Sequence, residues 1–347
     1  MKTVVSVNEI SEFEIKPQTE LNIWKKLVAE EINSRWVNKT GWVTVPCPVC
    51  NSSQVTPAFY KSFFSYVECN NCKTIFAETR PSANELSWWY TQSDSTRFWQ
   101  EKLLKLSAAS RNEKIIEPRS YWILDGLSEY LPKIPLKNIA YTDISFFGKG
   151  LIEKIAEAGH DMTIVSAGIT DGAEKYTSGN IQVNTLASID DLSPLKPTDV
   201  IVAIDVLERI SGIHHFMQQL ETVVNPGGLV FATCPVSSGF EIQSLWDKSP
   251  SIIPPDKLNL PTVTGLINLF SSSVKWKVLE LSTPGMFDVE VVRQVMLQSP
   301  NEKWPRSLHA LLDGIDTQGM GLFTEYLQSQ RLSSFARIVL QKEKDKI

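Results

Sequence analysis

The chain has 347 residues, of which 42% are hydrophobic and 21% charged, and its formal net charge is −5. This length accommodates two domains or one domain with large additions, and the composition is that of an ordinary globular protein. The acidic balance provides no positive field for nucleic acid or an anionic membrane. Acids near the N-terminus replace the apolar core of a signal peptide, and no apolar run approaches the roughly 20 residues of a membrane span. We therefore expect a cytoplasmic protein with reduced thiols.

Residues 1–40 contain one predicted helix, Thr19 to Trp36, because apolar side chains recur there at helical spacing. Its apolar face is expected to pack on a neighbouring domain. We assign this segment no chemistry.

Five cysteines occur in the chain, four of them as two C-x-x-C pairs within residues 41–80. These four are Cys47, Cys50, Cys69 and Cys72. Two pairs at this spacing can present four thiolates tetrahedrally to Zn²⁺, with a hairpin between them, as in a zinc ribbon. The alternatives are disulfides, disfavoured by the compartment, and a redox dithiol, which needs only one pair. Four protein ligands leave no open position, so zinc here would be structural. Cys234 ends a predicted strand and is expected to be a small buried residue.

Residues 81–135 form a predicted helical linker, with helical periods around Ala83–Tyr90, Thr96–Leu106 and Tyr121–Tyr130. One interpretation is a cap that covers the following sheet. The alternative is that aromatic residues line a pocket for a ring-shaped substrate, with Arg97 and Arg111 as anion clamps. The aromatic candidates are Trp88, Trp89, Tyr90 and Trp99.

The segment from Asn138 to Ser166 is predicted to fold as strand, turn, helix and strand. Its apolar run at Ile139–Ile144 breaks at a turn that contains Gly148 and Gly150, and a helical period follows. Such a βαβ unit usually opens a doubly wound parallel sheet, whose first turn binds a nucleotide-like cofactor. Residues 136–347 are therefore expected to form an α/β domain.

Further elements are expected along this domain, with Asn225–Gly228 as a turn and a largely helical insertion over residues 289–332. One more helix is predicted at Pro261–Phe270. The remaining strands are predicted at Ile181–Val183, Asp199–Asp205, Leu229–Cys234, Val274–Leu281 and Ala336–Gln341.

The strand Asp199–Asp205 runs into the sequence VLERI, and the NPGG turn precedes the strand LVFATCP. Together these features resemble a class I S-adenosylmethionine-dependent methyltransferase. The order of zinc ribbon, helical linker and sheet is similar to bacterial methyltransferases of sugar and surface-polysaccharide biosynthesis. The resemblance covers Val45 to Lys342. It implies a Rossmann-like sheet of order 3-2-1-4-5-7-6 with strand 7 antiparallel, and a small acceptor such as a nucleotide-linked sugar or polysaccharide precursor.

The turn after the first strand departs from the family pattern D-x-G-x-G-x-G, in which glycines let the backbone approach the cofactor. Gly148 and Gly150 are one place out of phase with that pattern. The residues in the three glycine positions, counted from Asp143, are Ser145, Phe147 and Lys149. Ser166 replaces the acid that binds the ribose hydroxyls in the family, so the cofactor motif is degenerate.

The resemblance places cofactor contacts at the ends of the first, second and fourth strands. These candidates are Asp143, Ser145, Gly148, Gly150, Ser166 and Asp205. The candidate general bases are Glu208, His214 and His215, although Glu208 could instead cap or pair near a helix start and the histidines could be surface residues. Two functions remain open: a methyltransferase acting on a small substrate, or a catalytically degenerate relative that serves as a binding module or partner subunit. A nicotinamide-binding Rossmann enzyme is disfavoured because no G-x-G-x-x-G follows the first strand.

Overall fold

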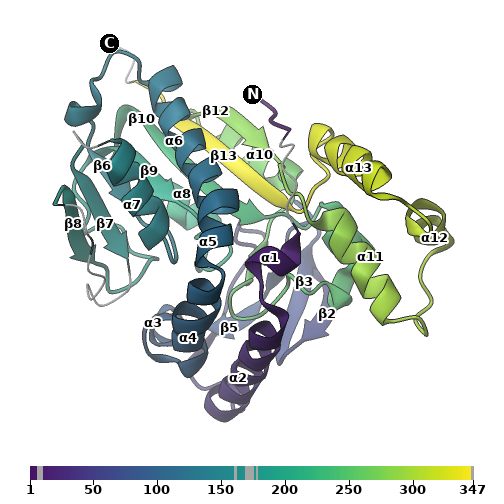
Figure 1. The fold of residues 1–347 in the computed structure, drawn as a ribbon. Coiled ribbons are helices and arrows are strands. Elements are labelled where there is room, and N and C mark those ends of the chain that lie inside the picture. The colour runs from purple at the N-terminus through teal and green to yellow at the C-terminus, as the bar shows by residue number, and fades with distance from the viewer. Residues whose placement is uncertain (6–10, 160–161, 169–175, 177–178, 345–347) are drawn as a thin grey trace.

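The computed structural model describes residues 1–5, 11–159, 162–168, 176 and 179–344. A central twisted sheet carries helices on both faces, and a smaller cysteine-containing sheet packs beneath it (Figure 1). A helical arm extends to one side. The architecture is therefore the expected α/β fold with added modules.

The central sheet has seven strands in the order β8-β7-β6-β9-β10-β13-β12. Counted along the domain this is 3-2-1-4-5-7-6, and β13 runs antiparallel to both β10 and β12. Both the order and the reversed strand confirm the prediction. The strands are β6 Tyr141–Asp143, β7 Ile164–Gly168, β8 Ile181–Thr185, β9 Thr198–Ala203, β10 Val224–Pro235, β12 Trp276–Ser282 and β13 Phe335–Lys342.

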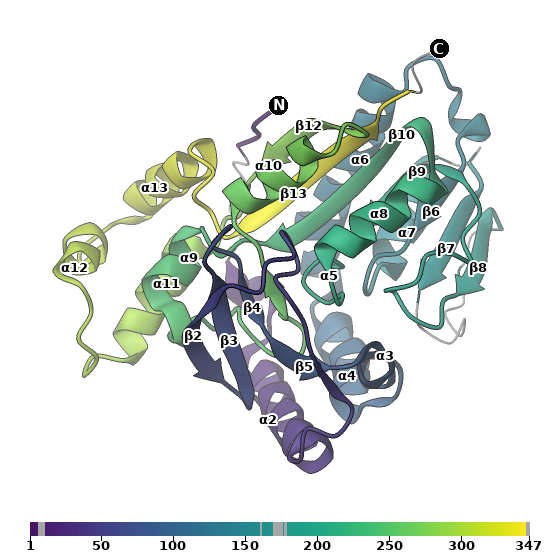
Figure 2. The same cartoon turned by 180° about the vertical axis from the view of Figure 1, so that it is seen from behind.

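Two helix layers bury the faces of this sheet. On β9, Val200 and Val202 join the apolar cluster under α6 and α7, while Ile201 and Ala203 join the cluster under α8 and α10. This alternation explains why the strand is apolar at every position. The covering helices are α6 Glu117–Tyr130, α7 Lys149–Ala158, α8 Ile213–Val223 and α10 Val263–Ser272, the last two seen best from behind (Figure 2).

The predicted turn at Asn225–Gly228 is wrong in detail, because these residues begin the long strand β10. The strand register shifts between Val224 and Leu229, so the segment is an irregular strand start. Gly227 has φ +83°, which favours glycine. A Cβ on Gly228 would lie 2.7 Å from the carbonyl oxygen of Asp199, which explains the second glycine.

The cysteine-containing segment forms a four-stranded antiparallel sheet of order β11-β4-β3-β2. Strand β11 comes from the sheet domain, far along the chain, and pairs with β4. A separate pair, β1 and β5, closes the base of the segment. The strands are β1 Trp42–Thr44, β2 Val55–Lys61, β3 Phe64–Cys69, β4 Ile75–Ala77, β5 Thr79–Pro81 and β11 Asn259–Leu260.

The N-terminal helix and the linker helices pack together below the carboxyl edge of the sheet (Figure 1). The predicted N-terminal helix is present and buries one face. The linker differs from prediction because π-helical turns at Trp99–Leu104 and Asn112–Ile116 interrupt it, with a short helix between them. The helices are α1 Glu12–Ile15, α2 Gln18–Trp36, α3 Ala83–Gln92, α4 Asp94–Phe98 and α5 Ala108–Arg111.

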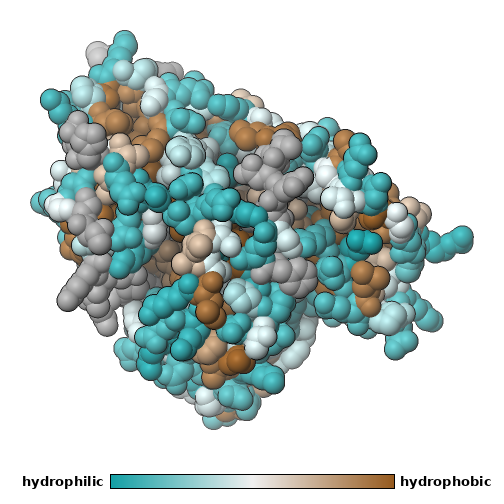
Figure 3. All heavy atoms as spheres, in the orientation of Figure 1, coloured by the Kyte–Doolittle hydropathy of each residue, from teal (hydrophilic) through white to brown (hydrophobic). Residues whose placement is uncertain are grey.

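The predicted helical insertion forms three helices beside the sheet. A further helix, α9 Phe240–Leu245, packs against the first of them, α11. Their apolar side chains form a separate small core that includes Val292, Leu308 and Leu327. The view in Figure 3 shows hydrophobic residues scattered among hydrophilic ones, also over this arm. No helix in the described part of the chain is long and apolar enough to cross a membrane. The arm helices are α11 Asp288–Gln298, α12 Arg306–Leu312 and α13 Thr317–Ser329.

Candidate functional site

The four cysteines of the two C-x-x-C pairs converge on one point. Their sulfur atoms all lie within 4.8 Å of one another. The Sγ atoms of Cys47 and Cys72 are 3.4 Å apart, and those of Cys50 and Cys69 are 3.5 Å apart. Four Zn–S bonds of about 2.3 Å would place tetrahedral sulfurs roughly 3.8 Å apart, so the cluster has the size of a Cys₄ metal site. A hydrogen bond from Cys47 lowers the pKa of Cys72 to about 5, which favours a thiolate ligand.

The two pairs adopt the same local turn. Asn51 and Lys73, each directly after the second cysteine of a pair, have φ values of 59° and 60°. The amide of Asn51 donates to the carbonyl of Cys47 at 2.9 Å, and that of Lys73 to Cys69 at 2.9 Å. This repeated geometry directs both pairs of thiols to a common centre.

Buried polar contacts join this module to the loop that follows β9. The Arg80 guanidinium donates to Asn259 Oδ1 at 2.7 Å, and both residues are buried. The Asn259 amide donates in turn to the carbonyls of Leu207 and Ile210. On the second cysteine pair, Thr262 Oγ1 donates to the Cys72 carbonyl at 2.8 Å. The module therefore supports the carboxyl edge of the central sheet.

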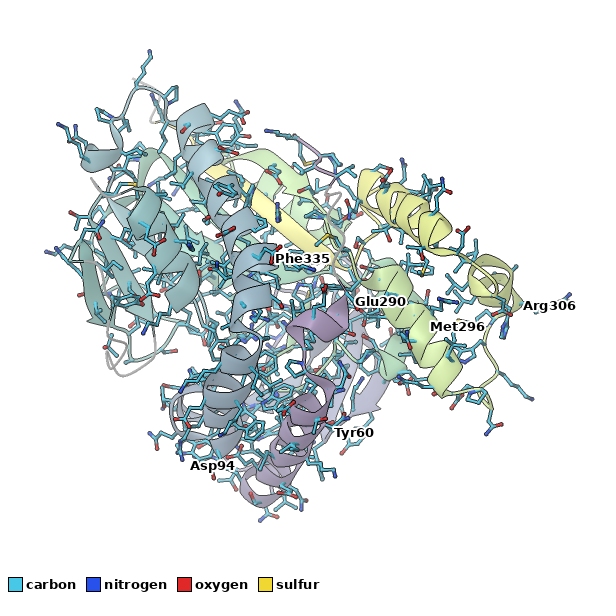
Figure 4. All side chains as sticks on the ribbon, in the orientation of Figure 1. Tyr60, Asp94, Glu290, Met296, Arg306 and Phe335 are labelled. Carbon is cyan, nitrogen blue, oxygen red and sulfur yellow. The ribbon has the colours of Figure 1, made fainter. Side chains whose placement is uncertain are left out.

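A cavity of about 1260 Å³ lies at that edge. Its walls include the turn between β6 and α7, the residues after β9, the linker helices, α1, α2 and α11. Figure 4 shows Phe335 and Glu290 on this wall, at the start of β13 and on α11 beside α1. The carboxyl ends of parallel strands are where open α/β sheets bind ligands.

The turn after β6 is held closed by its own side chains. Asp143 Oδ1 accepts from the Ser145 amide at 2.9 Å, and Ser145 Oγ accepts from the Ile204 amide at the end of β9 at 2.9 Å. Burial raises the pKa of Asp143 to about 6. A Cβ on Gly148 would lie 3.0 Å from Ser145 Cβ, and one on Gly150 would lie 2.8 Å from Ile116 Cδ1. Gly148 therefore leaves little room for a side chain within the turn, while Gly150, at the start of α7, lies against the tip of the Ile116 side chain from the linker.

Phe147 occupies a left-handed backbone conformation, with φ 54°, where the family pattern has glycine. Its ring lies against Trp99 and Phe146, at centroid distances of 6.5 and 6.3 Å, and lines the cavity. A bulky residue in this region costs roughly 1–2 kcal/mol relative to glycine. Phe147 thus has a backbone conformation that favours glycine, and its ring makes this part of the cavity wall aromatic.

Ser166 lies in the middle of β7, two residues before the strand ends, so the prediction that it ends the second strand is wrong; it is next to Asp143 in the sheet register and outside the cavity lining. Its Oγ is 2.8 Å from the Tyr176 hydroxyl. A neutral hydroxyl pair therefore stands where the family places a carboxylate.

Asp205, after β9, also has a left-handed backbone, with φ 57°. Its amide donates to Thr233 Oγ1 at 3.1 Å, and that hydroxyl donates back to Asp205 Oδ1 at 3.2 Å. Burial alone would raise the pKa of Asp205, but the charges of Arg119, Lys257 and Arg209 lower it to about 2. Asp205 is thus a fixed anion in the cavity wall and a poor base.

Glu208 also lines the cavity but is tied into an ion network. Its Oε1 accepts from Arg209 at 2.9 Å and from Lys257 at 2.6 Å. Arg209 also lies 3.8 Å from Asp256. Its Oε2 is buried without a partner, so one oxygen is held by the two cations and the other is left unpaired among the described residues.

His214 and His215 lie on α8 outside the cavity lining. The His214 amide donates to the Pro48 carbonyl in the first cysteine pair, and the His215 side chain is exposed. Their position matches the surface alternative.

Of the linker candidates, Trp99 and Arg111 line the cavity. Trp88 instead stacks under Arg35 at 3.6 Å, Trp89 stacks on Trp36 and Tyr90 packs on Phe146. Arg97 is exposed and pairs with Asp94. Most of the linker candidates therefore pack against other elements. Only Trp99 and Arg111 of these candidates have the position in a pocket that the alternative interpretation expects.

Sequence reasoning missed Glu241, a buried carboxyl group in the cavity wall on α9. It accepts from Ser249 Oγ at 2.5 Å and Ser251 Oγ at 2.9 Å. Burial and the nearby charge of Asp288 raise its pKa to about 7. The only sequence signal was a glutamate at the start of a short helix after the fifth strand, which is too common to be informative.

The seven-stranded order with one reversed strand and a cavity at its carboxyl edge defines a Rossmann-like methyltransferase fold. Residues 127–273 match a protein-family model described as "Methyltransferase domain". The central part of the chain is therefore similar to methyltransferase domains, in agreement with the strand order of its sheet.

Solved structures with a similar fold include three methyltransferases. Coclaurine N-methyltransferase bound to N-methylheliamine and S-adenosylhomocysteine has a TM-score of 0.41 at 12% identity, over 64% of this chain and 72% of that one. The plantazolicin methyltransferase BpumL with S-adenosylhomocysteine scores 0.43 at 12% identity, over 76% and 95%. An O-methyltransferase from a trans-AT polyketide synthase of Brevibacillus brevis, also with S-adenosylhomocysteine, scores 0.39 at 16% identity, over 68% and 76%. A search of curated protein sequences finds no match.

Proposed function

We propose that the protein is an S-adenosylmethionine-dependent methyltransferase that acts on a small molecule within the edge cavity. The observation that carries this proposal is the position of the cavity, between the β6–α7 turn and the residues after β9 of a methyltransferase domain. Its volume of about 1260 Å³ exceeds the 300–1,000 Å³ of ordinary ligand pockets and has room for a cofactor and an acceptor together.

The lining residues fit most of this cofactor. Its cationic amino-acid end finds the fixed anion of Asp205, and its flat base finds aromatic rings at Phe146 and Phe147. Its ribose hydroxyls would lack the usual carboxylate, because Ser166 on β7 takes the position of that acid. We therefore expect the cofactor to bind roughly tenfold or more weakly than it would with that carboxylate, because one charge-assisted hydrogen bond is missing.

When bound, S-adenosylmethionine supplies an electrophilic methyl group on its sulfonium. The chain supplies the remaining functions. Glu241, with a pKa of about 7, is placed to accept the proton of an acceptor hydroxyl or amine near neutral pH. Helices α1 and α2 and the linker cover the cavity and limit access of water.

For the acceptor, we propose a nucleotide-linked sugar or a related polysaccharide precursor. Support comes from the size of the cavity and from its arginines and lysines, among them Arg111 and Lys257. The cysteine cluster would hold one structural Zn²⁺, because its four ligands leave no open position. The protein is proposed to work in the cytoplasm, where these thiols stay reduced.

A second candidate is a degenerate methyltransferase-fold protein that serves as a binding module or partner subunit. Two observations favour it: the aromatic ring of Phe147 in a glycine position and the hydroxyl pair of Ser166 with Tyr176. Under this candidate the fold is retained and methyl transfer is lost.

The two candidates differ in calorimetry with S-adenosylhomocysteine and in methyl transfer from labelled S-adenosylmethionine to a pool of small metabolites. The proposal expects saturable binding and transfer, with transfer reduced at least 100-fold in Glu241→Gln. Glu302→Gln, on the exposed arm, is the matched control and should leave the rate unchanged. A flat titration up to millimolar ligand would overturn the enzyme proposal and favour the degenerate one.

A further inference from the structure

Three arginines from separate elements line one part of the cavity. Arg111 ends α5, Arg119 lies on α6, and Arg337 lies on β13. Their charges act on one another, because Arg119 lowers the pKa of both Arg111 and Arg337 to about 10, after the larger effect of burial. The fold therefore gathers three cations that repel one another.

This positive charge is poorly balanced among the described residues. Arg119 lies 3.7 Å from Asp205, a long ion pair, and its guanidinium stacks over Phe335 at 5.6 Å. Arg337 stacks over Trp122 at 5.2 Å, but its Nε is buried without a hydrogen-bond acceptor. Arg111 forms no ion pair in the described part of the chain.

The other acids near this part of the cavity have partners of their own. Glu280 accepts from Trp122 Nε1 at 3.0 Å and from Ser282 Oγ at 2.6 Å. Glu208 pairs with Arg209 and Lys257. Glu280 attracts Arg337 and raises its pKa, a smaller effect than the burial and the Arg119 charge that lower it, and neither carboxylate forms an ion pair with the three arginines in the described part of the chain.

A cluster of this kind has a direct physical consequence. The Nε atom of Arg337 is buried without an acceptor, and an N–H group that loses water without gaining a partner costs free energy. An anion with several oxygen atoms would accept from the planar guanidinium forks and cancel the repulsion between them. Arginine is the side chain best suited to phosphate and carboxylate for that reason.

We propose that Arg111, Arg119 and Arg337 form an anion-binding subsite for a phosphate or carboxylate group of a ligand in the cavity. The proposal deepens the proposed function, since it lies in the same cavity. It names one feature of the ligand: an oxyanion next to Asp205. The anion has two possible sources, a phosphate of the acceptor or the carboxylate at the amino-acid end of the cofactor.

The first test is calorimetric titration of the full chain with inorganic pyrophosphate, which requires no methyl donor. Binding is expected, and it should weaken about tenfold or more in Arg111→Gln and in Arg337→Gln, as each removes a charge-assisted hydrogen bond. The matched control is Arg97→Gln, a linker arginine that is exposed and pairs with Asp94. Melting temperatures of all variants report whether each is folded.

The second test identifies the source of the anion with two further probes. S-adenosylhomocysteine carries the carboxylate and 5′-methylthioadenosine lacks it. If Arg111→Gln weakens the binding of S-adenosylhomocysteine but not that of 5′-methylthioadenosine or pyrophosphate, the subsite holds the cofactor carboxylate. If it weakens only the binding of pyrophosphate, the subsite holds an acceptor phosphate. Either result supports the subsite.

The subsite is overturned if folded Arg111→Gln and Arg337→Gln bind pyrophosphate and S-adenosylhomocysteine as the unsubstituted chain does, or if the unsubstituted chain binds neither. Pyrophosphate binding without S-adenosylhomocysteine binding would instead support the subsite while overturning the methyltransferase proposal. The two proposals can therefore fail separately.

Discussion

The cysteine cluster and the β6–α7 turn are both short segments at which a ligand is expected to bind. They differ in whether their side chains face that ligand or bond to the surrounding protein. In the cluster, four Sγ atoms face a common centre and the protein leaves that centre free. In the turn, Asp143 and Ser145 bond to the surrounding backbone, and Phe147 fills the wall. The second loop is held together by its own side chains, whereas the first brings four thiols to within 4.8 Å of one another, as a metal site would require. A degenerate motif can therefore coexist with an intact fold.

The largest expected effect concerns the cluster. Cys69→Ser removes one of four ligands and should abolish zinc binding, with a loss of several kcal/mol of stability, because metal binding contributes directly to folding of such modules. Metal analysis should find about one Zn per unsubstituted chain and none in the variant, and thermal unfolding should report the loss of stability.

Cys234→Ser is its matched control, since Cys234 is equally buried but lies on β10 away from the cluster. This variant should retain the metal. Zinc at one per chain in Cys69→Ser would remove the metal-site interpretation.

The next effect concerns the contact between the cysteine module and the loop that follows β9. Asn259→Ala removes three buried hydrogen bonds, to Arg80, Leu207 and Ile210, and leaves the Arg80 guanidinium without its side-chain acceptor. We expect a loss of about 3 kcal/mol in the free energy of unfolding, measured by urea denaturation. Asn301→Ala, at an exposed position, should change it by less than about 0.5 kcal/mol. Equal effects of both substitutions would contradict the proposed link.

A third effect is a dependence on pH at the cavity. The folded pKa of Glu241 is about 7, above the usual value of 4.5, so the folded state holds a proton that the unfolded state releases. The bound proton therefore stabilises the folded state by about 3 kcal/mol below about pH 4.5. This contribution to the free energy of unfolding is lost as the pH rises to about 7. Denaturation of the unsubstituted chain and Glu241→Gln across this range should therefore show a smaller decline in the variant. Parallel curves would contradict a raised pKa.

The smallest effect tests the β6–α7 region for latent cofactor binding. Ser166→Asp places a carboxylate on β7 beside Asp143 and should tighten binding of S-adenosylhomocysteine about tenfold, since a charged acceptor strengthens a hydrogen bond. Ser166→Asn has the same size without the charge and should give little gain. Calorimetry measures both, and equal affinities would show that the missing acid is not what limits binding.

Most of the fold follows from sequence periodicity and from the family resemblance. Apolar runs at β9 and β13 and the helical spacing in α2 predicted these elements because they are buried by ordinary amphipathic packing. The π-helical turns of the linker and the strand start at Asn225–Gly228 were not predictable, because they depend on contacts with distant residues.

The cysteine cluster was predictable because its ligands are close in sequence and chemically distinctive. Glu241 and the group of Arg111, Arg119 and Arg337 were not, although Arg111 was named as one possible anion clamp. Their properties arise from burial and from one another's charges, and these appear only when separate elements meet around a cavity.

The pairing of β11 with β4 bears on how this protein can be taken apart. Deleting residues 1–80 would open the edge of β11 that pairs with β4, leave the Leu258 carbonyl without the Ala77 amide, and remove Arg80 from the Asn259 side chain. A methyltransferase domain expressed alone would thus be prone to association. In a chimaera, the cysteine module and the β11 segment of the host would have to be transplanted as a matched pair.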